Sequence, residues 1–251
     1  KYHEERELMN ITITGASGFL GQKLAHRLLS ANALTDSAGS PSRVEHLTLL
    51  DVVNPSKELS NDPRVTILTG DITDRLILEK AISVSTDSIF HFAAIVSSGA
   101  EKDFDLGMSV NLDATRAILE ICRGHETKPK LIFASSCAAF GGDMPNIIAD
   151  MTARTPQTSY GTQKVIGELL VNDFSRKSFV DGRALRFPTV VVRPGKPNKA
   201  ASTFASSIII EPLQGKTAIC PVSPESKMFL ASPRSIIENI VRAHNLIEDD
   251  W

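Results

Sequence analysis

A short β-branched strand runs directly into three glycines spaced three residues apart, and this feature constrains the fold more than any other. Residues 10–14 form the strand, the glycines are Gly15, Gly18 and Gly21, and leucines at helical spacing follow over residues 20–29. A strand, a glycine turn and a helix in this order place backbone N–H groups and the positive end of a helix dipole where a pyrophosphate can bind. The spacing is G-x-x-G-x-x-G rather than G-x-G-x-x-G, and glycines that only turn the chain are the alternative. The residues expected to contact a dinucleotide here are Gly15, Ser17, Gly18, Phe19, Leu20 and Gly21.

Strand patterns alternate with helix patterns as far as residue 192, which predicts an α/β fold with a Rossmann-like, doubly wound parallel sheet. Pro188 lies inside the sixth strand pattern and places that strand at an edge or a bulge. After residue 192 the alternation stops. We therefore expect a dinucleotide-binding domain over 9–192 and a small, partial substrate-binding lobe over 193–251, interleaved with the end of the first domain. Later strands are predicted at 47–50, 65–68, 88–94, 131–134 and 184–192, and later helices at 75–81, 111–123, 159–174, 202–210 and 233–246.

Three polar segments are predicted to be loops, at 31–45, 95–107 and 141–158. The second follows the fourth strand and lies at the carboxyl edge of the predicted sheet, where loops bind substrates in folds of this class. Ser97 and Ser98 in that segment are therefore candidate substrate-binding residues. Residues 1–8 precede Met9, which resembles a natural start, and they are left out of the predicted fold.

Composition excludes several classes of partner. Lysines and arginines number 27 against 29 acidic residues, a net charge of −2, so no basic face for nucleic acid or a membrane surface is expected. The three cysteines have neither paired nor metal-ligand spacing, which predicts no metal site and favours a reducing, cytoplasmic location. No apolar run approaches the roughly 20 residues that a membrane helix requires.

Two carboxylates follow predicted strands and bear on the cofactor. Asp51 ends the second strand, where a carboxylate accepts both adenosine ribose hydroxyls of NAD and repels the 2′-phosphate of NADP. An ordinary loop aspartate is the alternative. Asp71, followed by Ile72, closes the third strand and is predicted to meet the adenine amino group, to cap the helix at 75–81, or to do both. His91 lies inside the fourth strand and is predicted to be a hydrogen-bonded core residue rather than a catalytic one.

A tyrosine and a lysine one helical turn apart carry the predicted chemistry. Tyr160 and Lys164 lie on the same face of the helix at 159–174. An ammonium beside a phenol favours the phenolate, so the tyrosine pKa is expected to fall from about 10 toward working pH. Such a pair acts as a general base for an alcohol proton, and the hydroxyl of Ser136 is placed to hold the reacting oxygen. A solvent-exposed tyrosine and lysine without a role are the alternative.

Taken in order, the glycine turn, Asp51, Ser136 and the Tyr160–Lys164 pair resemble the extended short-chain dehydrogenase/reductase family, which includes nucleotide-sugar epimerases and dehydratases. The resemblance covers residues 9–246. It implies a catalytic triad of Ser136, Tyr160 and Lys164. It differs in two respects. Phe140 stands where the family usually has a second tyrosine, and the sequence stops soon after a helix, so either the C-terminal substrate lobe is shortened or the sequence is a fragment. Further cofactor contacts implied by the resemblance are Ala93, Ala94, Ile95, Asn111, Pro188 and Val190, in addition to Tyr160 and Lys164.

Four further segments resemble a branch of this family whose members oxidise the 2-hydroxyl of D-erythronate with NAD. They are residues 103–107, 179–183, 188–198 and 231–234. Arg193 and Lys196 are placed to bind a small carboxylate, which arginine does in bidentate fashion. A salt bridge that only orders the loop is the alternative for Arg193, and an exposed side chain is favoured for Lys196. The residues predicted to bind substrate are Ser97, Ser98, Ser136, Tyr160, Thr189 and Arg193.

The resemblance therefore predicts an NAD-dependent dehydrogenase for a small sugar acid. The alternative enzyme is a nucleotide-sugar epimerase or dehydratase that oxidises and re-reduces its substrate on tightly bound NAD. A cofactor-binding sensor without catalysis is a third hypothesis, which the intact Ser136, Tyr160 and Lys164 disfavour. By family analogy the helices at 111–123 and 159–174 pair across a two-fold axis to form a homodimer.

Overall fold

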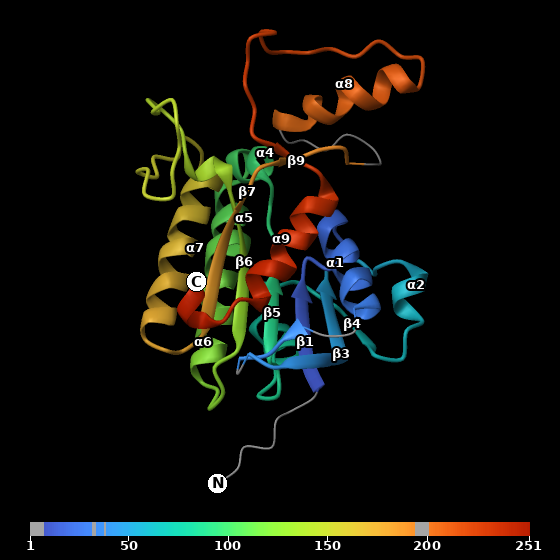
Figure 1. The fold of residues 1–251 in the computed structure, drawn as a ribbon, viewed down its shortest axis with the longest axis vertical. Coiled ribbons are helices and arrows are strands. Elements are labelled where there is room, and N and C mark those ends of the chain that lie inside the picture. Colours follow the sequence, from blue (N-terminus) through green and yellow to red (C-terminus); the bar gives the residue numbers. More distant parts are fainter. Residues whose placement is uncertain (1–7, 32–33, 38, 194–200) are drawn as a thin grey trace.

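The computed structural model describes residues 8–31, 34–37, 39–193 and 201–251, which form a sheet with helices on both faces (Figure 1). Parallel strands lie in the order β4, β3, β1, β5, β6, β7, and β2 pairs antiparallel with the start of β3. The strands of this sheet are β1 (Leu8–Thr14), β2 (Leu34–Thr35), β3 (Pro41–Asp51), β4 (Val65–Thr69), β5 (Ser88–His91), β6 (Lys130–Ser136) and β7 (Asp181–Phe187). Leu8 belongs to β1, so the predicted start of the fold at Met9 was one residue late.

The sheet is doubly wound, as predicted. From β1 the chain moves outward through β3 and β4, then returns to β5 on the other side of β1 and continues to β6 and β7. The strand order reverses between β1 and β5, and folds of this class bind ligands at the carboxyl ends of the strands there. Pro188 ends β7, which forms one edge of the sheet, in agreement with the predicted edge position.

The helices divide into two layers. In Figure 1, α6 and α7 lie on one side of the sheet, and α1 and α9 lie on the other. The helices are α1 (Phe19–Ser30), α2 (Lys57–Ser60), α3 (Arg75–Ala81), α4 (Ser97–Lys102), α5 (Phe104–Gly107), α6 (Ala114–Arg123), α7 (Ser159–Arg176), α8 (Phe204–Leu213) and α9 (Pro233–Asn245); a π-helix, η1 (Met108–Asp113), precedes α6.

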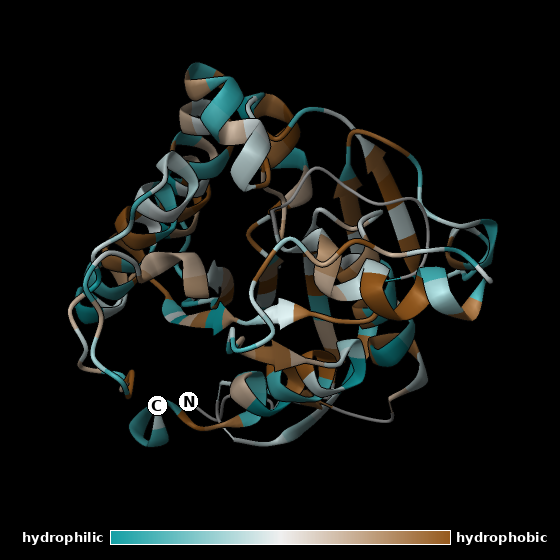
Figure 2. Cartoon of the chain, turned by 90° about the horizontal axis from the view of Figure 1, so that it is seen from above, coloured by the Kyte–Doolittle hydropathy of each residue, from teal (hydrophilic) through white to brown (hydrophobic). Residues whose placement is uncertain are grey.

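Both faces of the sheet are buried, and neighbouring residues of one strand belong to different cores. Ile89 and Leu131 belong to the core that includes residues of α3, α6 and α7. Phe90 and Ile132, the next residue in each strand, belong to the core that includes residues of α1 and α9. A strand covered on both faces reads as a continuous apolar run, which is why these strands were recognisable in the sequence. Seen from above, the strands carry mostly the apolar colour, and the helices around them alternate between apolar and polar positions (Figure 2).

Two predicted loops contain regular structure. Within 31–45, β2 forms a hairpin with the first residues of β3, and Leu34 is buried. Within 95–107 the chain forms α4 and α5, and Ala100 of α4 is completely buried. The serines and glycines of these segments have low helix or strand propensity, and burial of a few apolar side chains overrides it.

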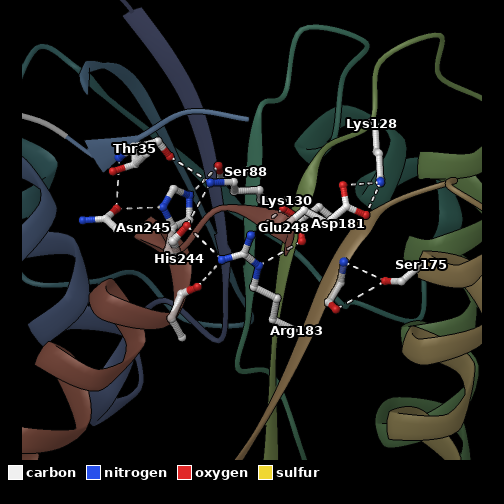
Figure 3. A network of polar contacts seen from close by, with 12 residues as sticks. Thr35, Ser88, Lys128, Lys130, Ser175, Asp181, Arg183, His244, Asn245 and Glu248 are labelled. Atoms are coloured by element: carbon white, nitrogen blue, oxygen red, sulfur yellow. Dashed lines mark hydrogen bonds and ion pairs between the residues drawn. The ribbon is translucent and has the colours of Figure 1, made fainter. Parts of the chain in front are cut away.

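A buried polar cluster at the amino edge of the sheet holds the end of α9 in place (Figure 3). The Lys130 ammonium donates to the carbonyl oxygens of Thr35, Asp36 and His244 at 2.9–3.0 Å. Arg183 forms a bidentate ion pair with Asp181 and also donates to carbonyls in the last turn of α9. Cations suit a helix C-terminus because its carbonyls carry partial negative charge. The cluster joins β6, β7 and α9, which are far apart in the sequence.

The segment after residue 200 reaches both ends of the molecule. α8 lies above the carboxyl edge in Figure 1, and the short strands β8 (Thr189–Val190) and β9 (Leu230–Ala231) pair in parallel below it. α9 returns to the main fold and contacts α1, β2, β6 and β7. None of the helices in the described part of the chain has the length and apolar character needed to cross a membrane.

Candidate functional site

A cavity of about 490 Å³ opens at the carboxyl ends of β1, β5, β6 and β7, on the side where the strand order reverses. Segments from across the chain meet there: the glycine turn, the end of β5, the residues around Ser136, the start of α7 and the segment 187–193. The predicted site residues that line the cavity are Gly15, Gly18, Phe19, Leu20, Gly21, Ala94, Ser97, Ser136, Tyr160, Lys164, Pro188, Thr189, Val190 and Arg193.

The glycine turn brings the start of α1 against the end of β1. Gly18 is the N-cap of α1, and no side chain caps the helix there. A Cβ at position 21 would collide with the carbonyl oxygen of Gly15, so glycine is required for this close approach. The open helix N-terminus on the cavity wall is suited to an anionic group, because its N–H groups and dipole favour negative charge. These residues therefore fit the pyrophosphate of a dinucleotide.

Asp51 ends β3 beside the glycine turn but does not line the cavity. Its Oδ2 accepts a hydrogen bond from the backbone N–H of Ser17 at 2.9 Å, and its Oδ1 accepts one from Val53 at 3.3 Å. The carboxylate thus lies next to the predicted phosphate site, on the side of β3. Its contact with ribose hydroxyls stays a prediction.

Asp71 and Ile72 follow β4 and lie outside the cavity lining. Asp71 accepts hydrogen bonds from the backbone N–H and the hydroxyl of Thr73, both at 2.9 Å. The N-cap of α3 is Asp74, whose side chain accepts from the Leu76 N–H. The alternative that Asp71 caps this helix is therefore wrong, because the chain makes one more turn before the helix begins. Ile72 is buried in the core beneath α3 and α6.

Tyr160 and Lys164 lie on the first turns of α7, and Ser136 lies at the end of the neighbouring strand β6. Ser136 is followed by a 3₁₀ turn, Cys137–Ala139, which packs directly on the start of α7. A Cβ at Gly161 would collide with the carbonyl oxygen of Ala138, so a glycine permits this contact. As a result Tyr160 and Ser136 meet at the cavity wall, where Ser136 lowers the Tyr160 pKa.

The electrostatics of this pair differ from the sequence prediction. Burial raises the pKa of Tyr160 above its usual value of 10, and the hydrogen bond to Ser136 only partly offsets this effect. Burial also lowers the pKa of Lys164 to about 8. The Lys164 ammonium lies 4.8 Å from the ring centre of Phe133 and 5.6 Å from that of Tyr160. The expected fall of the tyrosine pKa was wrong for this structure, because desolvation of the phenolate is the largest influence on that pKa.

Asn111 is buried behind the cavity rather than in its wall. Its side chain accepts from the Ile95 N–H at 2.8 Å and donates to the Ile95 carbonyl at 3.0 Å and to Gln163 at 2.7 Å. Asn111 lies in the π-helix η1, and such irregular turns often occur at functional sites. In this position the amide links the segment after β5 to Gln163 of α7.

The remaining predicted residues are distributed around the same end of the sheet. The Ala93 N–H donates to the hydroxyl of Thr14 at 3.3 Å, and Ser98 lies beside Ser97 in the first turn of α4. Arg193 is half-buried, and burial lowers its pKa. Lys196 lies outside the described residues.

His91 is a core residue, as predicted. Its ring nitrogens form hydrogen bonds with the hydroxyls of Thr14 and Thr115 at 2.7 and 2.9 Å. Burial lowers the pKa of His91 to about 3, and the charge of Lys164 adds to this effect. The ring is therefore neutral at physiological pH.

Sequence reasoning missed several residues of the cavity wall. Phe92 follows β5 and Phe187 ends β7, and their rings meet edge to face with their centres 6.3 Å apart. Their positions directly before the predicted residues Ala93 and Pro188 are a usable signal. Ser202 lies at the start of the helix predicted at 202–210, and it reaches the cavity only through the tertiary fold. The other missed lining residues are Val96, Ala134, Ser135, Cys137 and Ala138.

Among the described residues, no three His, Cys, Asp or Glu side chains gather as metal ligands would.

Comparison with known proteins gives concordant results. Residues 11–227 match the NAD dependent epimerase/dehydratase family. The D-erythronate dehydrogenase of Cupriavidus necator is 53% identical over 238 residues, which is 95% of this chain and 72% of that protein. The D-erythronate dehydrogenase of Haemophilus influenzae is 51% identical over 238 residues, covering 95% of this chain and 73% of its own length.

Solved structures share the fold. A crystal structure described as the nucleoside-diphosphate-sugar epimerase from Agrobacterium tumefaciens superimposes with a TM-score of 0.87 at 40% identity, covering 97% of this chain and 71% of that chain. A GalE-like L-threonine dehydrogenase from Cupriavidus necator, in its holo form, superimposes with a TM-score of 0.82 at 23% identity, covering 96% and 74%. The second similarity concerns the fold alone.

Proposed function

Because this chain belongs to the NAD dependent epimerase/dehydratase family, we propose that it is a dehydrogenase that oxidises the 2-hydroxyl of D-erythronate to 2-dehydro-D-erythronate with NAD. The observation that carries the proposal is its 53% identity to a D-erythronate dehydrogenase over 95% of the chain. The cavity supports it, because Ser136, Tyr160 and Lys164 share one wall and Arg193 another part of the lining.

The described residues fit a nicotinamide dinucleotide. The open N-terminus of α1 suits the pyrophosphate, and the lining from Gly15 to Val190 is continuous with it. Asp51, at the end of β3, favours NAD over NADP because its carboxylate would repel a 2′-phosphate. When bound, the nicotinamide ring supplies the hydride acceptor for the carbon that bears the hydroxyl.

Each side chain around the cavity has a proposed task. Tyr160, as phenolate, takes the proton of the substrate 2-hydroxyl, and the Ser136 hydroxyl hydrogen-bonds the reacting oxygen. Lys164, which lines the cavity, would supply a positive charge that stabilises the phenolate and would hold the nicotinamide ribose. Arg193 binds the substrate carboxylate, and Thr189, Ser97 and Ser98 complete the polar surroundings.

The test is a spectrophotometric screen of NAD reduction with purified protein over D-erythronate, other aldonates and uronates. We expect NADH to accumulate with D-erythronate and with NAD far more than with NADP. The proposal is refuted if no member of the panel gives net NADH.

The second candidate is a nucleotide-sugar epimerase, which the 40% identity to the Agrobacterium protein favours. An epimerase returns the hydride to its substrate, so it converts a UDP-sugar without net NADH formation. Assaying UDP-sugars by product chromatography in parallel with the NADH screen separates the two activities.

We further propose a homodimer in which α6 and α7 pair with their counterparts across a two-fold axis. These helices lie side by side on one face of the sheet, and Leu169 of α7 is half exposed there. Light scattering after size exclusion measures the mass.

We also propose that 9–192 forms the cofactor domain and that 193–251 supplies part of the substrate lobe, with α9 returning to the first domain.

A further inference from the structure

Glu168 accepts hydrogen bonds from three side chains near the cavity, although it does not line the cavity. One carboxylate oxygen accepts from the Ser135 hydroxyl and from Arg186 Nε, the latter at 3.0 Å. The other accepts from Arg186 Nη2 and from Arg154 Nη1, both at 2.9 Å. The Glu168 side chain is only 2% exposed. Burial alone would raise its pKa, but the hydrogen bonds from its three partners outweigh this and keep the pKa below its usual value.

The three partners come from three segments, and two of these segments line the cavity. Ser135 directly precedes Ser136 at the end of β6. Arg186 precedes Phe187 and Pro188 at the end of β7, and both of these line the cavity. Arg154 belongs to the loop before α7.

Glu168 also continues the catalytic face of α7. Tyr160, Lys164 and Glu168 are spaced four residues apart, so they lie above one another on one side of the helix. A single carboxylate therefore joins the helix that carries the base to the strand that carries Ser136 and to the strand end beside the substrate. Hydrogen bonds between charged groups are short and directional, so they hold these segments at defined distances.

Geometry of this kind matters for rate. A displacement of about 1 Å between reacting groups can cost roughly 100-fold in turnover. The Asp181–Arg183 pair at the amino edge is a useful contrast, since it is also bidentate and buried but lies at the opposite edge of the sheet, with no residue in the cavity lining. Loss of the Asp181 carboxylate removes the ion pair of the buried Arg183. Loss of the Glu168 carboxylate removes the ion pairs of the partly exposed Arg154 and Arg186, so each loss lowers stability.

We propose that Glu168 is a positioning residue for the reaction, setting Ser136 and Tyr160 relative to each other through its bonds to Ser135, Arg186 and Arg154. The proposal deepens the proposed function and rests on it for its kinetic test. It assigns Glu168 no contact with substrate or cofactor.

The kinetic experiment compares Glu168→Gln with Asp181→Asn, both assayed well below the lower melting temperature. We expect Glu168→Gln to lower kcat about 30- to 100-fold while KM and the Kd for NAD change less than about 3-fold. Asp181→Asn is expected to lose comparable thermal stability and keep kcat within about 2-fold. Equal kcat in both variants, or losses that only follow stability, would overturn the proposal.

Two further measurements keep the outcome decisive. Ser135→Ala removes one hydrogen bond and leaves the ion pairs, so we expect this variant to fold even if Glu168→Gln fails to do so. Its kcat should fall by about 3- to 10-fold. An unchanged kcat contradicts the proposal. The chain has two tyrosines, so ¹³C-tyrosine NMR with a Tyr160→Phe reference isolates the Tyr160 ring signal. That signal should move in the Ser135 and Glu168 variants and stay in place in Asp181→Asn. Because NMR needs no turnover, it decides the positioning role even if the wild-type protein oxidises no sugar acid.

Discussion

Burial acts on Tyr160 and Lys164 in opposite directions. It raises the pKa of the phenol above 10 and lowers the pKa of the ammonium to about 8, because a low-dielectric site disfavours the charged form of each group. Lys164 is therefore still mostly charged at neutral pH. Two groups this close titrate as a pair, so the loss of the first proton has a macroscopic pKa that describes the pair and not either residue alone.

Replacement of Tyr160 by phenylalanine tests the base directly. Tyr160→Phe removes the only phenol among the residues lining the cavity, and we expect kcat to fall by about 10²- to 10⁴-fold. Binding of NAD, measured by isothermal titration calorimetry, should change little, since the ring remains. A variant that retains more than a tenth of wild-type turnover would remove Tyr160 from the mechanism.

The pH dependence of oxidation tests the pair. In the wild type we expect log kcat to rise with pH and to level off once the pair has lost its first proton near pH 8. In Lys164→Met the phenol must ionise alone, with a pKa above 10, so log kcat should continue to climb through pH 10. Lys80→Met, at an exposed position of α3, is the control and should keep the wild-type profile. A plateau near pH 8 in Lys164→Met contradicts this account.

At the level of elements, the site depends on how closely α7 approaches the turn after β6. Helix α7 begins with a side-chain cap from Thr158 and packs on the 3₁₀ turn at Cys137–Ala139. The contact leaves no room for a Cβ at Gly161. This one approach brings the tyrosine of the helix within hydrogen-bond reach of the serine of the strand.

Gly161→Ala should therefore affect both stability and turnover. Inserting one methyl group into a packed contact costs about 1–3 kcal/mol, and for a chain of this size that lowers Tm by roughly 2–10 °C. We also expect kcat to fall more than about 10-fold, as Tyr160 moves away from Ser136. The control is Gly124→Ala at the exposed end of α6, where Tm should stay within about 2 °C and kcat should not change. Calorimetry and steady-state kinetics give the two readouts.

At the level of the whole molecule, the two edges of the sheet have different tasks. The carboxyl edge carries the cavity, and the amino edge carries the buried cluster of Lys130, Asp181, Arg183 and His244 that holds α9 (Figure 3). Buried titratable groups lie on both sides, and they make stability depend on pH. His91 and His244 each have a pKa lowered to about 3 by burial.

We expect the protein to lose stability as the pH falls below 6.5. In the unfolded chain both histidines take up a proton near pH 6.5, whereas the folded chain excludes it down to about pH 3. The unfolded state then binds more protons, so the free energy of unfolding decreases by up to about 1.4 kcal/mol per pH unit for each histidine. Urea unfolding at pH 7, 6 and 5 measures this slope, and His244→Gln should reduce it by roughly half. The partly exposed His26 provides the control, and a His26→Gln slope equal to that of His244→Gln contradicts the assignment.

The fold was largely predictable because its information is local. Gly15, Gly18 and Gly21 directly after a β-branched strand report local backbone geometry. The apolar residues at 89–90 and 131–134, inside β5 and β6, report two-sided burial. The segments at 31–45 and 95–107 were wrongly predicted to be loops, because their regular structure depends on contacts that are not local. Their serines and glycines indicate loops, and only contacts with distant residues stabilise β2, α4 and α5.

The features that appear as motifs were therefore determined by the sequence alone. They are the strand-turn-helix unit at the start of the fold, the doubly wound strand order and the candidate set of Ser136, Tyr160 and Lys164. The tertiary structure alone decided how these groups are tuned. It buries Tyr160 and Lys164 deeply enough to move their pKa values apart, brings Ser202 into the cavity, and places Glu168 among partners from three segments. The physical reason is that desolvation and long-range ion pairs depend on what surrounds a side chain in space, and the order of residues along the chain records only the neighbours in sequence.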